Sequence, residues 1–132
     1  DTNYLPSPTE RLKIYKKIQI TNNNDKVDEI KQNLIDRCGK MPSESINLLN
    51  NKKIQNRILN TGIKSIKSYE DRTNFTLSTN LKDSILDNLL NLISKDSSKY
   101  SLTKDNKFVY KFIESDANKR RNNVNLLLDE IL

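Results

Sequence analysis

The stretch from residue 34 to residue 42, LIDRCGKMP, constrains the fold of this chain most, because it joins the end of one helix to the start of the next. Gly39 suits the left-handed position just past a helix C-terminus, and Pro42 cannot continue the helix that it follows. Apolar side chains precede this stretch at helical spacing and share one face: Val27, Ile30, Leu34 and Cys38. We therefore predict two helices that meet at a structural elbow, residues 34–42, set by Gly39 and Pro42.

Four polar side chains project from the opposite face of the same predicted helix: Glu29, Gln32, Asn33 and Asp36. We call these four residues the polar strip. Helical spacing places Asp36 roughly opposite the apolar face, so its carboxylate should point outward. On the residues alone, an ordinary solvated face is favoured over a surface that binds a partner.

The change of hydrophobic period along the chain predicts an α+β fold. Three N-terminal helices are followed by two strand pairs, which form a small, mainly antiparallel sheet and are interleaved with two further helices. The predicted helices cover residues 8–20, 25–38, 43–60, 81–94 and 116–131, and the strands cover 63–69, 74–78, 99–102 and 108–112. Residues 1–6 are interpreted as the end of a linker and residues 7–132 as a single domain.

Several residues are assigned to the core or to helix ends within these elements. The first helix is predicted to direct three side chains inward: Leu12, Tyr15 and Ile18. Ser7 is predicted to cap that helix, Gly62 to close the third helix, and Asn80 to cap the helix over residues 81–94. Asparagine is abundant, with 19 residues, and we expect many of these side chains to be filler.

The net charge of +6 and the pI near 9.4 permit a polyanionic partner, although the charges do not cluster strongly along the sequence. Residues 107–112, KFVYKF, combine lysine with aromatic side chains and could stack on single-stranded nucleic acid. However, Phe108, Tyr110 and Phe112 share one face of a strand, which favours packing in the core. The basic run at residues 119–121 is interpreted as the solvated side of the last helix.

Catalytic chemistry is poorly represented. The chain has no His, a single Cys and only two Gly, each predicted to end a helix. These absences remove the commonest general base and metal ligand, and leave no glycine-rich phosphate-binding loop. We predict no catalytic, cofactor-binding or metal-binding residue in this chain. A lone Cys38 suits a reducing compartment, and no apolar run approaches the length of a membrane span.

The elbow resembles the LIDRFGxLP element in the C-terminal domain of bacterial transcription-repair coupling factors (Mfd). The matching residues are Leu34, Ile35, Asp36, Arg37, Gly39 and Pro42. Leu5-Pro6 followed by Arg11-Leu12, Tyr15-Lys16 and Ile18 is similar to the first helix of that family, and Leu48-Leu49 and Gly62-Ile63 are similar to its later helix and LGI ending. The family usually has Phe at the position of Cys38 and often Glu at the position of Asn33.

The resemblance implies a non-catalytic regulatory domain. In the family this domain docks on the UvrA-binding domain of the same polypeptide, masks UvrA recruitment and restrains the ATP-driven DNA translocase until stalled RNA polymerase is engaged. The polar strip is the expected intramolecular interface. The expected partners of the full-length protein are RNA polymerase, UvrA and DNA, in nucleotide excision repair in the bacterial cytoplasm, with no membrane. The alternatives are a basic nucleic-acid-binding module and a plain scaffold domain.

Overall fold

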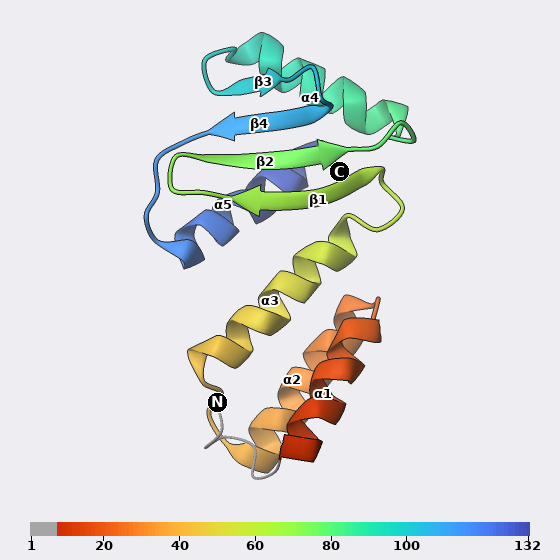
Figure 1. The fold of residues 1–132 in the computed structure, drawn as a ribbon, viewed down its shortest axis with the longest axis vertical. Coiled ribbons are helices and arrows are strands. Elements are labelled where there is room, and N and C mark those ends of the chain that lie inside the picture. Colours follow the sequence, from red (N-terminus) through yellow and green to blue (C-terminus); the bar gives the residue numbers. More distant parts are fainter. Residues whose placement is uncertain (1–7) are drawn as a thin grey trace. The chain divides into compact units, whose positions relative to one another are not determined.

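The computed structural model describes residues 8–132, and it confirms the α+β prediction within that range (Figure 1). The predictions for Ser7 and for the linker over residues 1–6 lie outside the described residues. The chain divides into two compact units, a helical unit that ends at Arg57 and an α/β unit over Ile58–Leu132. The prediction of one domain over residues 7–132 stays a prediction, because two compact units can still fold together.

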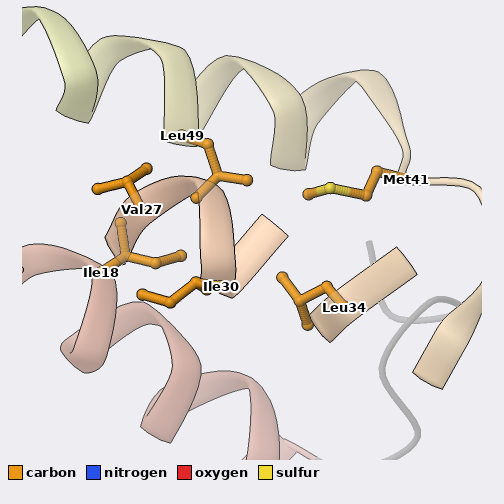
Figure 2. Close-up of a cluster of buried hydrophobic side chains, with 6 residues drawn as sticks. All are labelled: Ile18, Val27, Ile30, Leu34, Met41 and Leu49. Carbon is orange, nitrogen blue, oxygen red and sulfur yellow. The ribbon is translucent and has the colours of Figure 1, made fainter. Parts of the chain in front are cut away.

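The helical unit consists of α1 (Pro8–Ile20), α2 (Asn24–Cys38) and α3 (Ser43–Arg57). Side chains from all three helices and from the elbow point toward one another in a buried cluster, which Figure 2 shows: Ile18, Val27, Ile30, Leu34, Met41 and Leu49. Full burial of one such side chain stabilises the fold by about 1.5–3 kcal/mol relative to leaving it exposed. This cluster therefore fixes which face of α2 is turned inward.

Two predictions about the helical unit are corrected. Leu12 is 54% exposed, and Ile14 instead packs against the buried cluster. At about 100° per residue, Leu12 lies roughly a third of a turn away from Ile18, whereas Ile14 lies within about 40° of it. In addition, α3 ends at Arg57 rather than at Asn60, and Asn60 itself adopts a positive φ of 62°.

The α/β unit contains a four-stranded antiparallel sheet in the order β1-β2-β4-β3. Its strands are β1 (Ile63–Ser68), β2 (Arg72–Leu77), β3 (Tyr100–Leu102) and β4 (Lys107–Lys111), and its helices are α4 (Asp83–Lys95) and α5 (Ala117–Ile131). Both helices cover the same face of the sheet. In Figure 1, α5 passes behind β1 and β2. The Asn88 side chain of α4 donates a hydrogen bond to the Ile131 carbonyl of α5, which joins the two helices.

The covered face of the sheet is aromatic. Phe75 is paired with Phe108 across β2 and β4, both are fully buried, and their ring centroids lie 5.8 Å apart. Tyr110 stacks on Tyr100 of β3 with centroids 5.1 Å apart and lies 4.6 Å from the ring of Phe112. The prediction that Phe108, Tyr110 and Phe112 share one packed face is therefore confirmed.

The ends of the later helices differ in part from the predictions. Asp116 caps α5, where its Oδ1 accepts hydrogen bonds from the backbone N–H groups of Asn118 at 2.8 Å and Lys119 at 3.1 Å. The bonds from Lys119 and Asn118 lower the pKa of the Asp116 carboxyl below its ordinary value. Lys82 occupies the cap position of α4 without a side-chain bond, so the prediction that Asn80 caps this helix is wrong.

Candidate functional site on the second helix

The α2 helix is positioned by well-defined ends. Asn23 caps its N-terminus, where Oδ1 accepts hydrogen bonds from the backbone N–H groups of Asp25 at 2.8 Å and Lys26 at 3.3 Å. At the other end, the Gly39 N–H donates to the Ile35 carbonyl at 2.8 Å. Each bond satisfies a backbone group that the helix itself leaves without a partner. The two fixed ends of α2 therefore determine the direction in which the residues of the polar strip point.

Gly39 differs in detail from the predicted left-handed cap. Its φ of 83° is positive, as expected, but its ψ of −157° lies far from the left-handed helical value. This combination belongs to an extended region that glycine alone adopts readily. The chain consequently leaves α2 in an extended direction, and the Pro42 carbonyl accepts the first helical hydrogen bond of α3 from Ile46 at 3.1 Å.

All four residues of the polar strip lie exposed on α2: Glu29, Gln32, Asn33 and Asp36. The buried residues Val27, Ile30 and Leu34 occupy the other side of the helix. Within the strip, the Gln32 Nε2 donates a hydrogen bond of 2.9 Å to Asp36 Oδ1. The strip thus presents two carboxylates and two amides on one solvent-facing surface, and its role in binding stays a prediction.

Ion pairs flank the polar strip on both sides. Arg37 bonds Glu10 of α1 at 2.6 Å, and Lys53 of α3 bonds Asp28 at 2.8 Å. Exposed pairs of this kind contribute about 0–1 kcal/mol each. The pair formed by Arg37 also matters for Asp36, because it directs the Arg37 guanidinium toward α1 and away from the polar strip.

Asparagine side chains join α2 to α3, a role that the filler interpretation missed. Asn56 Nδ2 donates to the Thr21 carbonyl and to Asn24 Oδ1, both at 3.0 Å, and Asn24 Nδ2 donates to the Lys53 carbonyl at 3.2 Å. Composition hides this role, because the bonds join residues some 30 positions apart. The one sequence signal is local: Asn23 stands directly before an amphipathic helix, where a cap is expected.

The α/β unit has a polar groove lined mainly by α4, β3 and the end of α5, including Asn88, Tyr100 and Glu130. Burial raises the pKa of the Tyr100 and Tyr110 hydroxyls, and nearby Glu130 adds to both shifts. A hydrogen bond from the Ser98 hydroxyl is the largest cause of a lowered pKa at Asp96. These shifts come from packing and turn geometry, and they give no sign of catalysis.

Metal-binding and membrane-spanning features are absent from the described part of the chain. No group of three or more His, Cys, Asp or Glu residues within residues 8–132 could hold a metal ion. None of the helices over that range is both long and apolar enough to cross a membrane.

The arrangement of three helices, a four-stranded antiparallel sheet and two further helices defines an α+β fold with a known counterpart. A crystal structure of the C-terminal domain of a transcription-repair coupling factor matches it with a TM-score of 0.81 over 99% of this chain and 84% of that one. The sequences are 14% identical, so this likeness shows the fold alone. A comparison with curated proteins finds no match.

Sequence comparison identifies the family. The family model named TRCF domain, for transcription-repair coupling factor, matches residues 1–87, which is more than half of the chain. The chain therefore belongs to the transcription-repair coupling factor family and corresponds to its C-terminal domain. The resemblance predicted from the elbow is confirmed.

Proposed function

We propose that this chain is the non-catalytic, autoinhibitory C-terminal domain of a transcription-repair coupling factor. In this proposal it docks through the polar strip on the UvrA-binding domain of the same polypeptide, masks UvrA recruitment and restrains the ATP-driven DNA translocase. The supporting observation is that α2, in a chain of this family, keeps the whole strip exposed beside the matched elbow. RNA polymerase, UvrA and DNA are then the partners of the full-length protein in the bacterial cytoplasm.

The chemistry of the strip suits a clamp that must open. Docking within one polypeptide occurs at high effective concentration, so a modest contact is sufficient to hold it closed. Charged and amide groups can be rehydrated when the contact separates, whereas a large apolar seam would resist release. A polar contact of this kind therefore permits both the closed and the open state.

Asp36 is the central residue of the proposed contact. Its Oδ1 accepts the hydrogen bond from Gln32, which orients the carboxylate and leaves Oδ2 for a cationic group on the partner domain. Arg37, a possible local competitor, instead pairs with Glu10. Asn33 stands where the family often has Glu, so this strip carries one carboxylate fewer and is expected to dock less tightly.

The domain is proposed to contribute no chemistry of its own. The chain contains no His and only two Gly, both at bends of the backbone with positive φ. It thus lacks the residues that a nucleotide-binding loop and the commonest general base require. Regulation through binding is consistent with this composition.

The test is Asp36→Arg in the full-length protein. Replacement of attraction by repulsion at a charged interface can cost several kcal/mol, so the variant should bind UvrA more tightly and show higher basal ATPase activity. Both effects should appear together, because one docking equilibrium controls them. The matched control is Asp87→Arg, which makes the same charge change at an exposed position on α4.

Thermal unfolding of the 132-residue chain separates this effect from a loss of structure. An exposed substitution usually changes stability by no more than about 0.5 kcal/mol, so Asp36→Arg should melt with the parent. Unchanged UvrA affinity and ATPase activity in a folded Asp36→Arg protein would refute the clamp. Equal activation by Asp87→Arg would attribute the effect to net charge rather than to the polar strip.

A further inference from the structure

The face of the sheet opposite α4 and α5 carries a set of basic side chains. They come from different strands, so no single strand sequence shows that they lie together. The antiparallel register places Arg72 opposite Lys111, Thr76 opposite Lys107, and Lys67 opposite Asn74. The neighbouring positions Thr73 and Phe75 are buried on the covered face, so these six residues point the other way. We call Lys67, Arg72, Lys107 and Lys111 the basic sheet face.

No acidic side chain belongs to this face within the four strands. Its other strand positions carry Ser65, Asn74, Thr76, Ser101 and Val109. The carboxylates that reach its cations come from the turns: Asp71 bonds Arg72 at 2.8 Å, and Asp105 lies 3.6 Å from Lys107. Lys67 and Lys111 have no carboxylate partner among residues 8–132.

The pairing of Arg72 with Lys111 is unfavourable for the sheet alone. Directly opposed side chains on neighbouring strands lie about 4.5–5.5 Å apart at Cβ, and like charges at that distance destabilise the pair. Lys67 lies diagonally across from Arg72 at the same end of the sheet, which adds a third positive charge. A polyanion bound at this face would relieve the repulsion.

We propose that the basic sheet face binds the phosphate backbone of double-stranded nucleic acid without sequence preference. Lys107 and Lys111 are four residues apart, which spans about 13 Å along a strand. Lysine and arginine spread over this length can contact several phosphates, and such contacts carry no sequence information. This proposal is independent of the docking role of the polar strip.

A duplex suits the face better than a single strand. Single strands are held largely by stacking of their bases on exposed aromatic rings. Here Phe75, Phe108 and Tyr110 lie on the covered face, and the half-exposed Tyr69 ring is already covered by the Arg72 guanidinium at 4.4 Å. A duplex keeps its bases internal and presents phosphates, which are the groups that this face can bind.

The test uses the 132-residue chain and a short, fluorescently labelled duplex of mixed sequence, followed by anisotropy between about 50 and 200 mM salt. Contacts from two to four cations predict a slope of log affinity against log salt between about −1.8 and −3.6. The double variant Lys67→Gln, Lys111→Gln should lower affinity at least about tenfold at 0.1 M salt and reduce the slope by about 1.8.

The matched control is Lys82→Gln, Lys95→Gln, which removes two exposed charges at the ends of α4. This control should retain most of the affinity, whereas an equal loss in both double variants would overturn the proposal. No duplex binding at the lowest salt, or tighter binding of the single strand, would also overturn it. Tighter binding of polyglutamate than of the duplex would assign the face to an acidic protein instead.

Circular dichroism melting checks that the variants are folded. If the Lys67→Gln, Lys111→Gln protein melts early, Lys107→Gln alone provides the same test at the other end of the face, with an expected slope reduction of about 0.9. The charge-preserving variant Lys67→Arg, Lys111→Arg should bind the duplex like the parent, and a loss of binding in that folded variant would contradict a phosphate contact.

Discussion

Gly62→Ala should destabilise the α/β unit strongly, because two segments of backbone meet at this glycine. A Cβ at Gly62 would lie 2.3 Å from Leu81 Cα, 2.7 Å from Leu81 N and 2.9 Å from the Asn80 carbonyl carbon. Hydrogen bonds hold the segments together, from the Ser78 N–H to the Gly62 carbonyl at 2.8 Å and from the Lys82 N–H to the Thr61 carbonyl at 3.2 Å. No side-chain rotation relieves a contact with backbone.

The expected loss combines two effects. The φ of Gly62 is 90°, where a residue with a Cβ is strained by about 1–2 kcal/mol. Displacement of packed atoms adds about 1–3 kcal/mol. The sum, about 2–5 kcal/mol, is a large part of the roughly 4–11 kcal/mol expected for a unit of this size. The melting temperature of the unit should fall by more than about 10 °C.

Gly39→Ala supplies the comparison. Gly39 also has a positive φ, of 83°, but no heavy atom would lie within 4 Å of its added Cβ. Only the backbone strain remains, which is about 1–3 kcal/mol. The exposed substitution Thr79→Ala, close to the Gly62 contact in sequence, should have almost no effect.

Urea denaturation followed by circular dichroism gives the ranking of the variants, and amide hydrogen exchange shows which unit opens. Gly62→Ala should accelerate exchange in β1 and β2, whereas Gly39→Ala should affect α2 and α3. An unchanged urea midpoint for Gly62→Ala, or one no lower than that of Gly39→Ala, would refute the steric reasoning.

Three further outcomes follow from the caps and the tyrosines. Asn23→Ala should lower stability by about 1 kcal/mol, with Asn22→Ala near neutral in the same urea titration. Because the folded pKa of Asp116 is lowered, its carboxylate stabilises the fold above the unfolded pKa, and this stabilisation is lost as the pH falls through the folded value. In melting curves recorded over a series of pH values, Asp116→Asn should therefore lose less of its melting temperature at acid pH than the parent does. The raised pKa values of Tyr100 and Tyr110 act in the opposite direction: the two tyrosines stabilise the fold fully below the unfolded pKa near 10, and this stabilisation is lost as the pH rises through the folded values. The melting temperature of the double variant Tyr100→Phe, Tyr110→Phe should therefore fall less at alkaline pH than that of the parent.

Local patterns predicted the helices and strands of this chain well. The period of Val27, Ile30 and Leu34 places one face of α2 in the core, and the structure buries all three. Such predictions succeed because helical spacing is set by neighbouring residues. One error was Leu12, which lies about a third of a turn away from Ile18 and is exposed, whereas Ile14 lies on the inward face and packs against the core of the helical unit.

The two glycines show what can and cannot be predicted from neighbouring residues. Both were predicted to close helices, and Gly39 does follow α2. Gly62 instead precedes β1, and its conformation is required by the backbone near Leu81, which is about twenty residues away. A short-range signal for a turn was present at both positions, but the reason for the second glycine exists only in the folded chain.

The two proposed surfaces differ in the same way, because local spacing sets the polar strip and strand pairing sets the basic sheet face. The polar strip could be predicted because Glu29 and Asp36, seven residues apart, lie about two helical turns from each other on one face. The basic sheet face could not, since the charge pair formed by Arg72 and Lys111 depends on a strand register between residues nearly forty positions apart. The scattered lysines of the sequence thus became a surface only when β2 and β4 paired. A low density of charge along the sequence is therefore a poor argument against a charged face in a sheet.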